Sequence, residues 1–166
     1  MKKIFLILAF FTLVFSACKK NDTGTTTPAV DPAVQAKIDD DKIVAYLAAN
    51  KITAQKDASG LYYLIVNPGS GTAPTVKSTI TVAYTGKLLD NGSTFQTDPN
   101  FTNLLGPNSS NLGLIKGWQI GIPFIKSGGR ILLYIPSALG YGTVPKNGIP
   151  PNSVLIFTID LFSFQG

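Results

Sequence analysis

The sequence predicts an α+β domain in which an antiparallel sheet is wrapped on one short helix, with a further helix preceding it. Residues 79–95 have the form of a β-hairpin, because Ile80, Val82 and Tyr84 alternate with smaller or polar residues and Asp90-Asn91-Gly92 then allows the chain to reverse. Residues 153–164 (SVLIFTIDLFSF) have the length and composition of a closing strand. Residues 117–122 (GWQIGI) are expected to form a helix that Pro123 keeps brief. Several strands and one short helix make an α+β domain.

Composition limits the chemistry available to the chain. Its 166 residues, 45% of them hydrophobic and 14% charged, suffice for one globular domain with appendages. There is no histidine and no glutamate, which excludes histidine-based triads, the HExxH zinc site and a glutamate general acid. The formal net charge is +5, or +3 (12 basic against 9 acidic residues) without Lys2 and Lys3. Because the basic residues are scattered, a solvated surface is favoured over a nucleic-acid-binding groove.

Residues 1–17 are interpreted as a secretory signal peptide. Lys2-Lys3 precede an apolar run over residues 4–15 and the small pair Ser16-Ala17. The run is too short to cross a bilayer comfortably as a helix. Cys18, the only cysteine, follows directly and resembles the cysteine of a bacterial lipobox. That resemblance implies a diacylglyceryl group on Cys18 and a lipid anchor in the cell envelope, on the periplasmic or the surface face. The alternative is a secreted protein with an incidental free thiol.

A tether and a helix are expected next. Residues 18–30 are polar, threonine-rich and without hydrophobic period, so they are interpreted as a flexible tether behind the lipidated cysteine. Residues 31–51 are expected to be helical, with Asp31 as N-cap and Pro32 as first helical residue. Consecutive aspartates at 39–41 point in different directions on a helix and are interpreted as a solvated acidic face. The apolar stripe is expected to dock on the domain or to pair with a second copy. Its members are Val34, Ile38, Ile43, Ala45, Tyr46, Leu47 and Ala48.

The domain is placed at residues 58–166. A short apolar strand is expected at residues 60–66 (GLYYLIV), followed by a turn at residues 68–71. Residues 96–111, rich in Asn, Pro and Ser, are expected to be irregular. Residues 130–135 (RILLYI) form a strand in this interpretation, and a long loop over residues 137–151 leads to the closing strand. One face of that last strand carries Leu155, Phe157, Ile159 and Leu161.

Four motifs, in this order, resemble those of the FKBP-type peptidyl-prolyl cis-trans isomerases. They are VAYTGKLLDNGSTF (82–95), LIKGW (114–118), LGYG (139–142) and GIPPNSVLIFTIDL (148–161). The resemblance covers roughly residues 60–164 and implies a bent antiparallel half-barrel with a short helix across its concave face. The segment before it resembles the N-terminal extension of secreted bacterial members. The implied activity is isomerisation of proline-containing polypeptides during folding of cell-envelope proteins, with no metal and no cofactor.

The resemblance also implies which residues surround the proline. The expected catalytic residues are Tyr84, Phe95, Trp118, Tyr141 and Phe157, and the expected substrate-binding residues are Gln96, Leu114, Ile115 and Ile149. Trp118 corresponds to the floor of the pocket, the Tyr141 hydroxyl to the group that reaches the substrate carbonyl, and the Ile115 amide to a second donor. Phe101 is a candidate for a further aromatic. Gln96 stands where the family usually has aspartate, so turnover is expected to be retained but reduced, and macrolide inhibitors to bind more weakly.

The residue types suit this chemistry without acid, base or covalent intermediate. Rotating an X-Pro bond meets a barrier of about 18–20 kcal/mol that comes from amide resonance. A dry aromatic pocket solvates the planar, polar amide poorly and the twisted, less polar amide relatively better. Two alternatives stay open: a non-catalytic peptide-binding or chaperone module on the same fold, and a structural surface lipoprotein.

Overall fold

The described part of the chain, residues 30–107 and 113–166 of a computed structural model, forms one curved sheet with a helix on each side of it. The helices are α1 (Pro32–Ala49) and α2 (Lys116–Gly121), with 3₁₀ turns η1 (Ile122–Phe124) and η2 (Ser137–Leu139). The strands are β1 (Gln55–Lys56), β2 (Tyr62–Asn67), β3 (Thr79–Leu88), β4 (Thr94–Leu104), β5 (Gly129–Ile135) and β6 (Leu155–Gln165).

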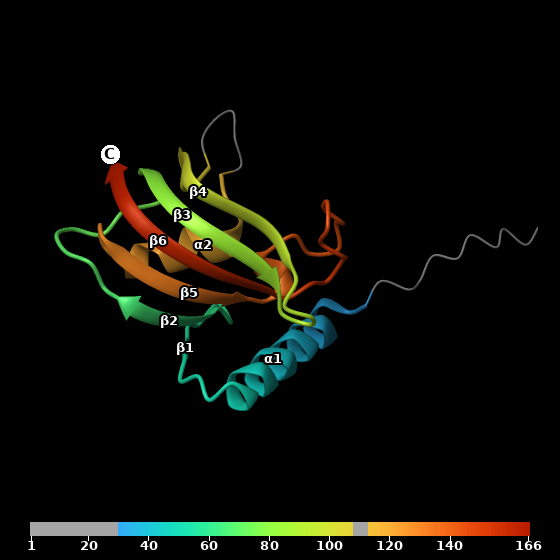
Figure 1. Ribbon diagram of the computed structural model, residues 1–166. Helices are drawn as coiled ribbons and strands as arrows, with labels where there is room; N and C mark the ends of the chain where they lie inside the picture. Colours follow the sequence, from blue (N-terminus) through green and yellow to red (C-terminus); the bar gives the residue numbers. More distant parts are fainter. Residues whose placement is uncertain (1–29, 108–112) are drawn as a thin grey trace, which may run out of the picture.

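All neighbouring strands are antiparallel, in the order β1-β2-β5-β6-β3-β4. Figure 1 shows α2 against one face of the bent sheet and α1 outside it. The predicted α+β class, the wrapped helix and the N-terminal helix are therefore confirmed. The predicted signal peptide, Cys18 and the tether up to residue 29 lie outside the described residues. Within the described residues, no helix is both long and apolar enough to cross a membrane.

The main core lies between the sheet and α2. Strand β3 alternates as predicted: Ile80, Val82 and Tyr84 are buried, and Thr81 and Ala83 between them are only partly covered. Strand β6 pairs with β3 on one side and β5 on the other, so its inward side chains meet those of both neighbours. This core also contains Ile131, Leu133, Ile135, Leu155, Phe157, Ile159, Leu161, Trp118 and Ile122. The hairpin turn reverses at Gly92, whose φ of 69° lies in the left-handed region that glycine adopts without strain.

A second core lies on the outer face of the sheet, beneath α1. Ile43 and Leu47 of the helix pack with Tyr62, Tyr134 and Ile156. Ile156 points away from α2 because it alternates with Leu155 and Phe157 along β6. Docking on the domain, one of the two arrangements expected for this helix, is therefore the one observed in the single chain.

The surface of α1 that meets the sheet differs from the predicted stripe. Asp39, Ile43 and Leu47 are its buried residues, spaced four apart, whereas Val34 and Ile38 are exposed. Side chains at i, i+4 and i+8 lie one above the other on a helix, so a narrow row suffices for contact with the sheet. The ends agree with prediction: the Ala33 amide donates to the Asp31 carboxylate over 2.7 Å, and Asn50 caps the other end.

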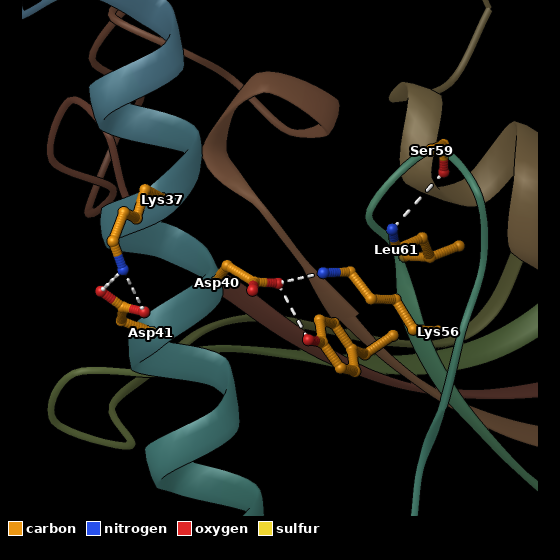
Figure 2. Close-up of polar contacts among 7 residues, drawn as sticks. Lys37, Asp40, Asp41, Lys56, Ser59 and Leu61 are labelled. Carbon is orange, nitrogen blue, oxygen red and sulfur yellow. Dashed lines mark hydrogen bonds and ion pairs between the residues drawn. The ribbon is translucent and has the colours of Figure 1, made fainter.

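The three consecutive aspartates do not form one solvated face, so that prediction is wrong. Asp39 is fully buried, and its carboxylate accepts hydrogen bonds from Ser137. Asp40 pairs with Lys56 over 2.6 Å (Figure 2), and its carboxylate also accepts from the Tyr62 hydroxyl. Asp41 stays at the surface beside Lys37, one turn away (Figure 2). Successive residues of a helix point about 100° apart, so the three aspartates face different directions, and the side of α1 that docks is the one that carries Asp39.

The segment after the hairpin is a strand, not the irregular stretch expected from residue 96 onward. Strand β4 runs along the edge of the sheet, with Val82 opposite Phe101 and Tyr84 opposite Asp98. The two residues Pro99 and Asn100 therefore face the single residue between Val82 and Tyr84, which makes a β-bulge. Proline is tolerated at a bulge on an edge strand because it has no amide proton to offer a neighbour. This bulge explains how a polar, proline-containing sequence can still pair with β3.

Candidate functional site

A cavity of about 130 Å³ lies between the inner face of the sheet and the start of α2. Residues of three strands, α2 and two connecting segments line it: Tyr84, Gln96, Phe101, Leu114, Ile115, Trp118, Tyr141 and Phe157. The structure thus brings together all the site residues expected from the sequence except Phe95 and Ile149. Phe101, named only as a candidate, is among the lining residues, because β4 continues as a strand far enough to carry it there.

Aromatic rings form most of the wall, and they contact one another edge to face. The centroids of Tyr84 and Trp118 are 5.0 Å apart, and those of Trp118 and Phe157 are 5.2 Å apart. Phe101 meets Tyr84 at 5.5 Å and an interplanar angle of 83°. Such contacts favour defined ring orientations, since the positive edge of one ring faces the negative face of another. The cavity is therefore bounded by rings that hold each other in place.

Trp118 owes its position to a close approach of α2 to the sheet. Ile115 is the N-cap residue, and its carbonyl accepts the amides of Trp118 (3.0 Å) and Gln119 (3.2 Å). A Cβ on Gly117 would lie 2.7 Å from the Ile135 side chain, so a residue larger than glycine would push α2 away. The indole itself is buried, and its Nε1 has no hydrogen-bond partner among the described residues.

Phe95 and Ile149 lie just outside the cavity, in a neighbouring hollow that Gln96 and Tyr141 also line. The Phe95 ring stands edge to face on Phe157, with centroids 5.6 Å apart, so it supports the cavity wall from behind. Ile149 is buried, and its amide donates to the Lys146 carbonyl over 2.8 Å. These two residues extend the apolar surface beyond the cavity.

The two tyrosine hydroxyls are the polar groups whose protonation the site perturbs. Burial, followed by the charges of Asp98 and Tyr141, raises the pKa of Tyr84 above its ordinary value. Burial raises the pKa of Tyr141 as well. A tyrosine hydroxyl is already protonated at neutral pH at its ordinary pKa of about 10, so both groups can donate hydrogen bonds, and the raised pKa values extend this toward alkaline pH. Asp98 faces Tyr84 across β3 and β4, whereas Gln96 lies opposite Gly86.

The cavity is thus apolar, aromatic and poor in charge. Its lining contains neither a carboxylate nor an amine, and its polar side chains are the two tyrosines, one glutamine and the indole. Such a surface suits a small apolar ring, while the few donors fix the orientation of an attached amide. The arrangement can remove water from a bound group and orient it, but its lining provides no strong general acid, general base or nucleophile.

Comparison with known proteins gives a consistent result. A family model described as FKBP-type peptidyl-prolyl cis-trans isomerase matches residues 70–162. The FKBP-type peptidyl-prolyl cis-trans isomerase FkpA of Escherichia coli strain K12 is 44% identical over 109 residues, which cover 65% of this chain and 39% of that protein. Peptidyl-prolyl cis-trans isomerase Mip of Coxiella burnetii is 34% identical over 128 residues, covering 75% of this chain and 54% of that protein.

Solved structures show the same likeness. The crystal structure of FkpA from Escherichia coli matches with a TM-score of 0.63 and 32% sequence identity, covering 80% of this chain and 63% of that one. The matched part of this chain spans between about two fifths and just over half the length of the two curated relatives.

Proposed function

Since this chain belongs to the family of FKBP-type peptidyl-prolyl cis-trans isomerases, we propose that its aromatic cavity binds X-Pro segments of polypeptides and accelerates rotation about the prolyl bond. The observation that carries the proposal is the meeting of the Tyr84, Trp118 and Phe157 rings around one cavity. A proline ring is apolar and small, and the amide before it is the bond that must turn.

The physical basis is differential solvation of two amide geometries. The planar amide is polar because of resonance, and rotating it meets a barrier of about 18–20 kcal/mol. At the twisted geometry resonance is lost and the carbonyl oxygen carries less charge. An aromatic cavity from which water is excluded destabilises the planar amide more than the twisted one, which lowers the barrier. Every step is non-covalent, so the absence of strong acids and bases in the lining is no obstacle.

The proposed roles follow from position. The Trp118 indole forms the floor against which the proline ring rests. The Tyr141 hydroxyl, whose pKa is raised by burial, donates to a substrate carbonyl. The Ile115 amide, at the start of α2, is the second proposed donor. Gln96 contacts the substrate from the rim, and Phe95 and Ile149 contact the flanking residue of the peptide.

Two functions without catalysis compete with this proposal: peptide binding by a chaperone module, and a structural role at the cell surface. The apolar cavity with the Tyr141 hydroxyl in its lining favours binding of a ligand over a purely structural role, because a structural role requires no such cavity. A binding module would retain affinity for proline peptides without accelerating exchange.

A cis–trans exchange assay on Leu-Pro and Phe-Pro peptides tests the proposal. The protein should accelerate exchange, and Tyr141→Phe should lower kcat/KM while the fold is retained. Tyr63→Phe is the matched control, because this half-buried tyrosine packs on Phe124 outside the cavity and its hydroxyl donates to Gln55. Binding of the peptides without acceleration would identify a chaperone module, and neither binding nor acceleration would favour the structural role.

We propose further that the protein is anchored in the cell envelope by a lipid on Cys18 and assists the folding of proteins there. The support comes from sequence alone: a charged start, an apolar run and small residues directly before the only cysteine. A diacylglyceryl chain on that sulfur would hold the domain at a membrane, with residues 18–30 as tether. Mass spectrometry of protein extracted from membranes should find an acylated N-terminal cysteine, and an intact Met1 would refute the anchor.

A further inference from the structure

A buried carboxylate that does not line the cavity connects α1 to the loop that carries Tyr141. One oxygen of Asp39 accepts hydrogen bonds from the Ser137 amide (2.8 Å) and the Ser137 hydroxyl (2.6 Å). The other oxygen accepts from the Gln35 side chain over 2.8 Å. Asp39 is fully buried, and Ser137 is almost so. Both carboxylate oxygens therefore have partners, and the interaction is shielded from water, where charge-assisted hydrogen bonds are strong.

Ser137 in turn organises the backbone on both sides of Tyr141. Its carbonyl accepts the amides of Gly140 (3.0 Å) and Gly142 (2.8 Å), which are the two neighbours of that tyrosine. Ser137 opens the 3₁₀ turn η2, and Pro136, the cap residue of that turn, makes no side-chain capping bond. Asp39, from a different element, supplies the acceptor that the start of the turn would otherwise lack.

We propose that Asp39 is a positioning residue for catalysis, which holds the Tyr141 hydroxyl in register with the aromatic cavity by fixing Ser137. This inference rests on the proposed function of Tyr141. The apolar contacts of Ile43 and Leu47 attach α1 to the sheet, but such contacts are non-directional and tolerate small shifts. Hydrogen bonds, by contrast, require a narrow range of length and angle. Those of Asp39 therefore fix the position of the Tyr141 loop relative to the docked helix. On this view α1 belongs to the catalytic unit.

Asp40 provides a matched control on the same helix. It anchors α1 to the domain through Lys56 and Tyr62 and makes no hydrogen bond to the Tyr141 loop. Asp39→Asn should lower kcat/KM for a Leu-Pro peptide about tenfold, since misplacing a reacting group by a fraction of an ångström has effects of this order. Asp40→Asn should leave kcat/KM within about twofold, because the loop keeps its anchor. Equal losses in the two variants would overturn the proposal in favour of general helix docking.

A double-mutant cycle separates positioning from a loss of stability. If Asp39 acts through the Tyr141 hydroxyl, Asp39→Asn should have almost no further effect in a Tyr141→Phe background. Independent, multiplying losses would overturn the proposal. Ser137→Ala keeps the hydrogen bond from the backbone amide to Asp39 and removes only the one from the hydroxyl. It should show the same pattern with a smaller loss of kcat/KM, and it replaces Asp39→Asn in the cycle if that variant does not fold.

Amide hydrogen exchange reads the same contact without relying on activity. Exchange at Gly140 and Gly142 should be faster in Asp39→Asn than in the unsubstituted protein, and unchanged in Asp40→Asn. Unchanged exchange at both glycines in Asp39→Asn would overturn the proposal even in an active enzyme. If the unsubstituted protein does not accelerate prolyl exchange, the proposed function fails on that result, and the amide measurement alone decides whether Asp39 fixes the loop.

Discussion

The indole of Trp118 meets the Tyr84 ring edge to face, with centroids 5.0 Å apart and ring planes at 84°. Each such aromatic pair contributes about 0.5–1.5 kcal/mol beyond its buried area. Trp118 makes three of them, with Tyr84, Phe101 and Phe157. The floor of the cavity is thus defined by contacts among rings, and its shape depends on the size of this one side chain.

Trp118→Phe should therefore lower kcat/KM roughly tenfold while preserving the fold, because a smaller ring loses part of these contacts and widens the cavity. Prolyl exchange and urea denaturation would be measured together. Phe124→Leu is the control, since that ring packs on Tyr63 away from the cavity. A Trp118→Phe enzyme as active as the unsubstituted one would show that the indole is ordinary core.

Gln96→Asp should raise kcat/KM and tighten the binding of macrolide inhibitors. Gln96 lines the cavity, and a carboxylate accepts hydrogen bonds from a ligand more strongly than an amide does. Thr97→Asp adds the same charge one residue away, opposite Thr85, where the side chain faces the other side of the strand. Unchanged activity and unchanged inhibitor affinity in Gln96→Asp would contradict the importance given to this position.

The sequence predicted the parts of the fold that local patterns encode. Alternation identified β3, the turn residues identified its hairpin, and β6 stood out as an apolar run. The residues of the cavity were expected instead from the resemblance of four motifs to those of a known family. Strand β4 was missed because its residues are polar and include Pro99, and only pairing with β3 makes them a strand. Edge strands bury little surface, so their hydrophobic pattern is weak.

Contacts between distant elements could not be predicted in the same way. Nothing local distinguishes Asp39 from Asp40 and Asp41, and its burial depends on Ser137, 98 residues later in the chain. The predicted stripe of α1 was too wide for a related reason: Val34 and Ile38 are apolar, but both remain exposed to solvent after the helix docks. Such features are fixed by packing, which the hydrophobic period of one helix does not specify.

Ile43→Ala should reduce the free energy of unfolding by about 2–5 kcal/mol, the usual cost of truncating a fully buried aliphatic side chain. Ile43 is inaccessible to solvent beneath α1, whereas its neighbour Val44 is 49% exposed. Val44→Ala, measured by the same urea titration, should change the free energy of unfolding by less than about 0.5 kcal/mol. Equally small effects at both positions would mean that α1 is not docked on the sheet in solution.

Tyr134→Phe should stabilise the protein by about 1 kcal/mol, because the buried hydroxyl has no partner among the described residues and its desolvation is uncompensated. The ring itself would remain packed near Tyr46, at a centroid distance of 6.0 Å. Tyr63→Phe, which removes a hydroxyl bonded to Gln55 at the surface, provides the comparison. A destabilised Tyr134→Phe variant would indicate that the hydroxyl makes a hydrogen bond in solution.

Alkaline pH should lower the free energy of unfolding, whereas catalytic activity should not depend on pH near neutrality. Burial is the main cause that raises the pKa values of Tyr62, Tyr84, Tyr134 and Tyr141 above 10.0. A raised pKa means that the folded state holds the proton more tightly than the unfolded state does. The free energy of unfolding is therefore unaffected by these groups below about pH 9 and falls as the pH rises through 10 and beyond.

The hydrogen bond from Lys56 to Asp40 acts in the same direction, because it raises the pKa of Lys56. Urea denaturation at several pH values between about 7 and 11 should show a plateau followed by a decline. Removing one ionisable hydroxyl by Tyr134→Phe should make the decline less steep, whereas kcat/KM should stay level from about pH 6 to 9, where neither cavity tyrosine ionises. A free energy of unfolding that rises above pH 10, or a bell-shaped activity profile centred near neutrality, would contradict this account of the buried tyrosines.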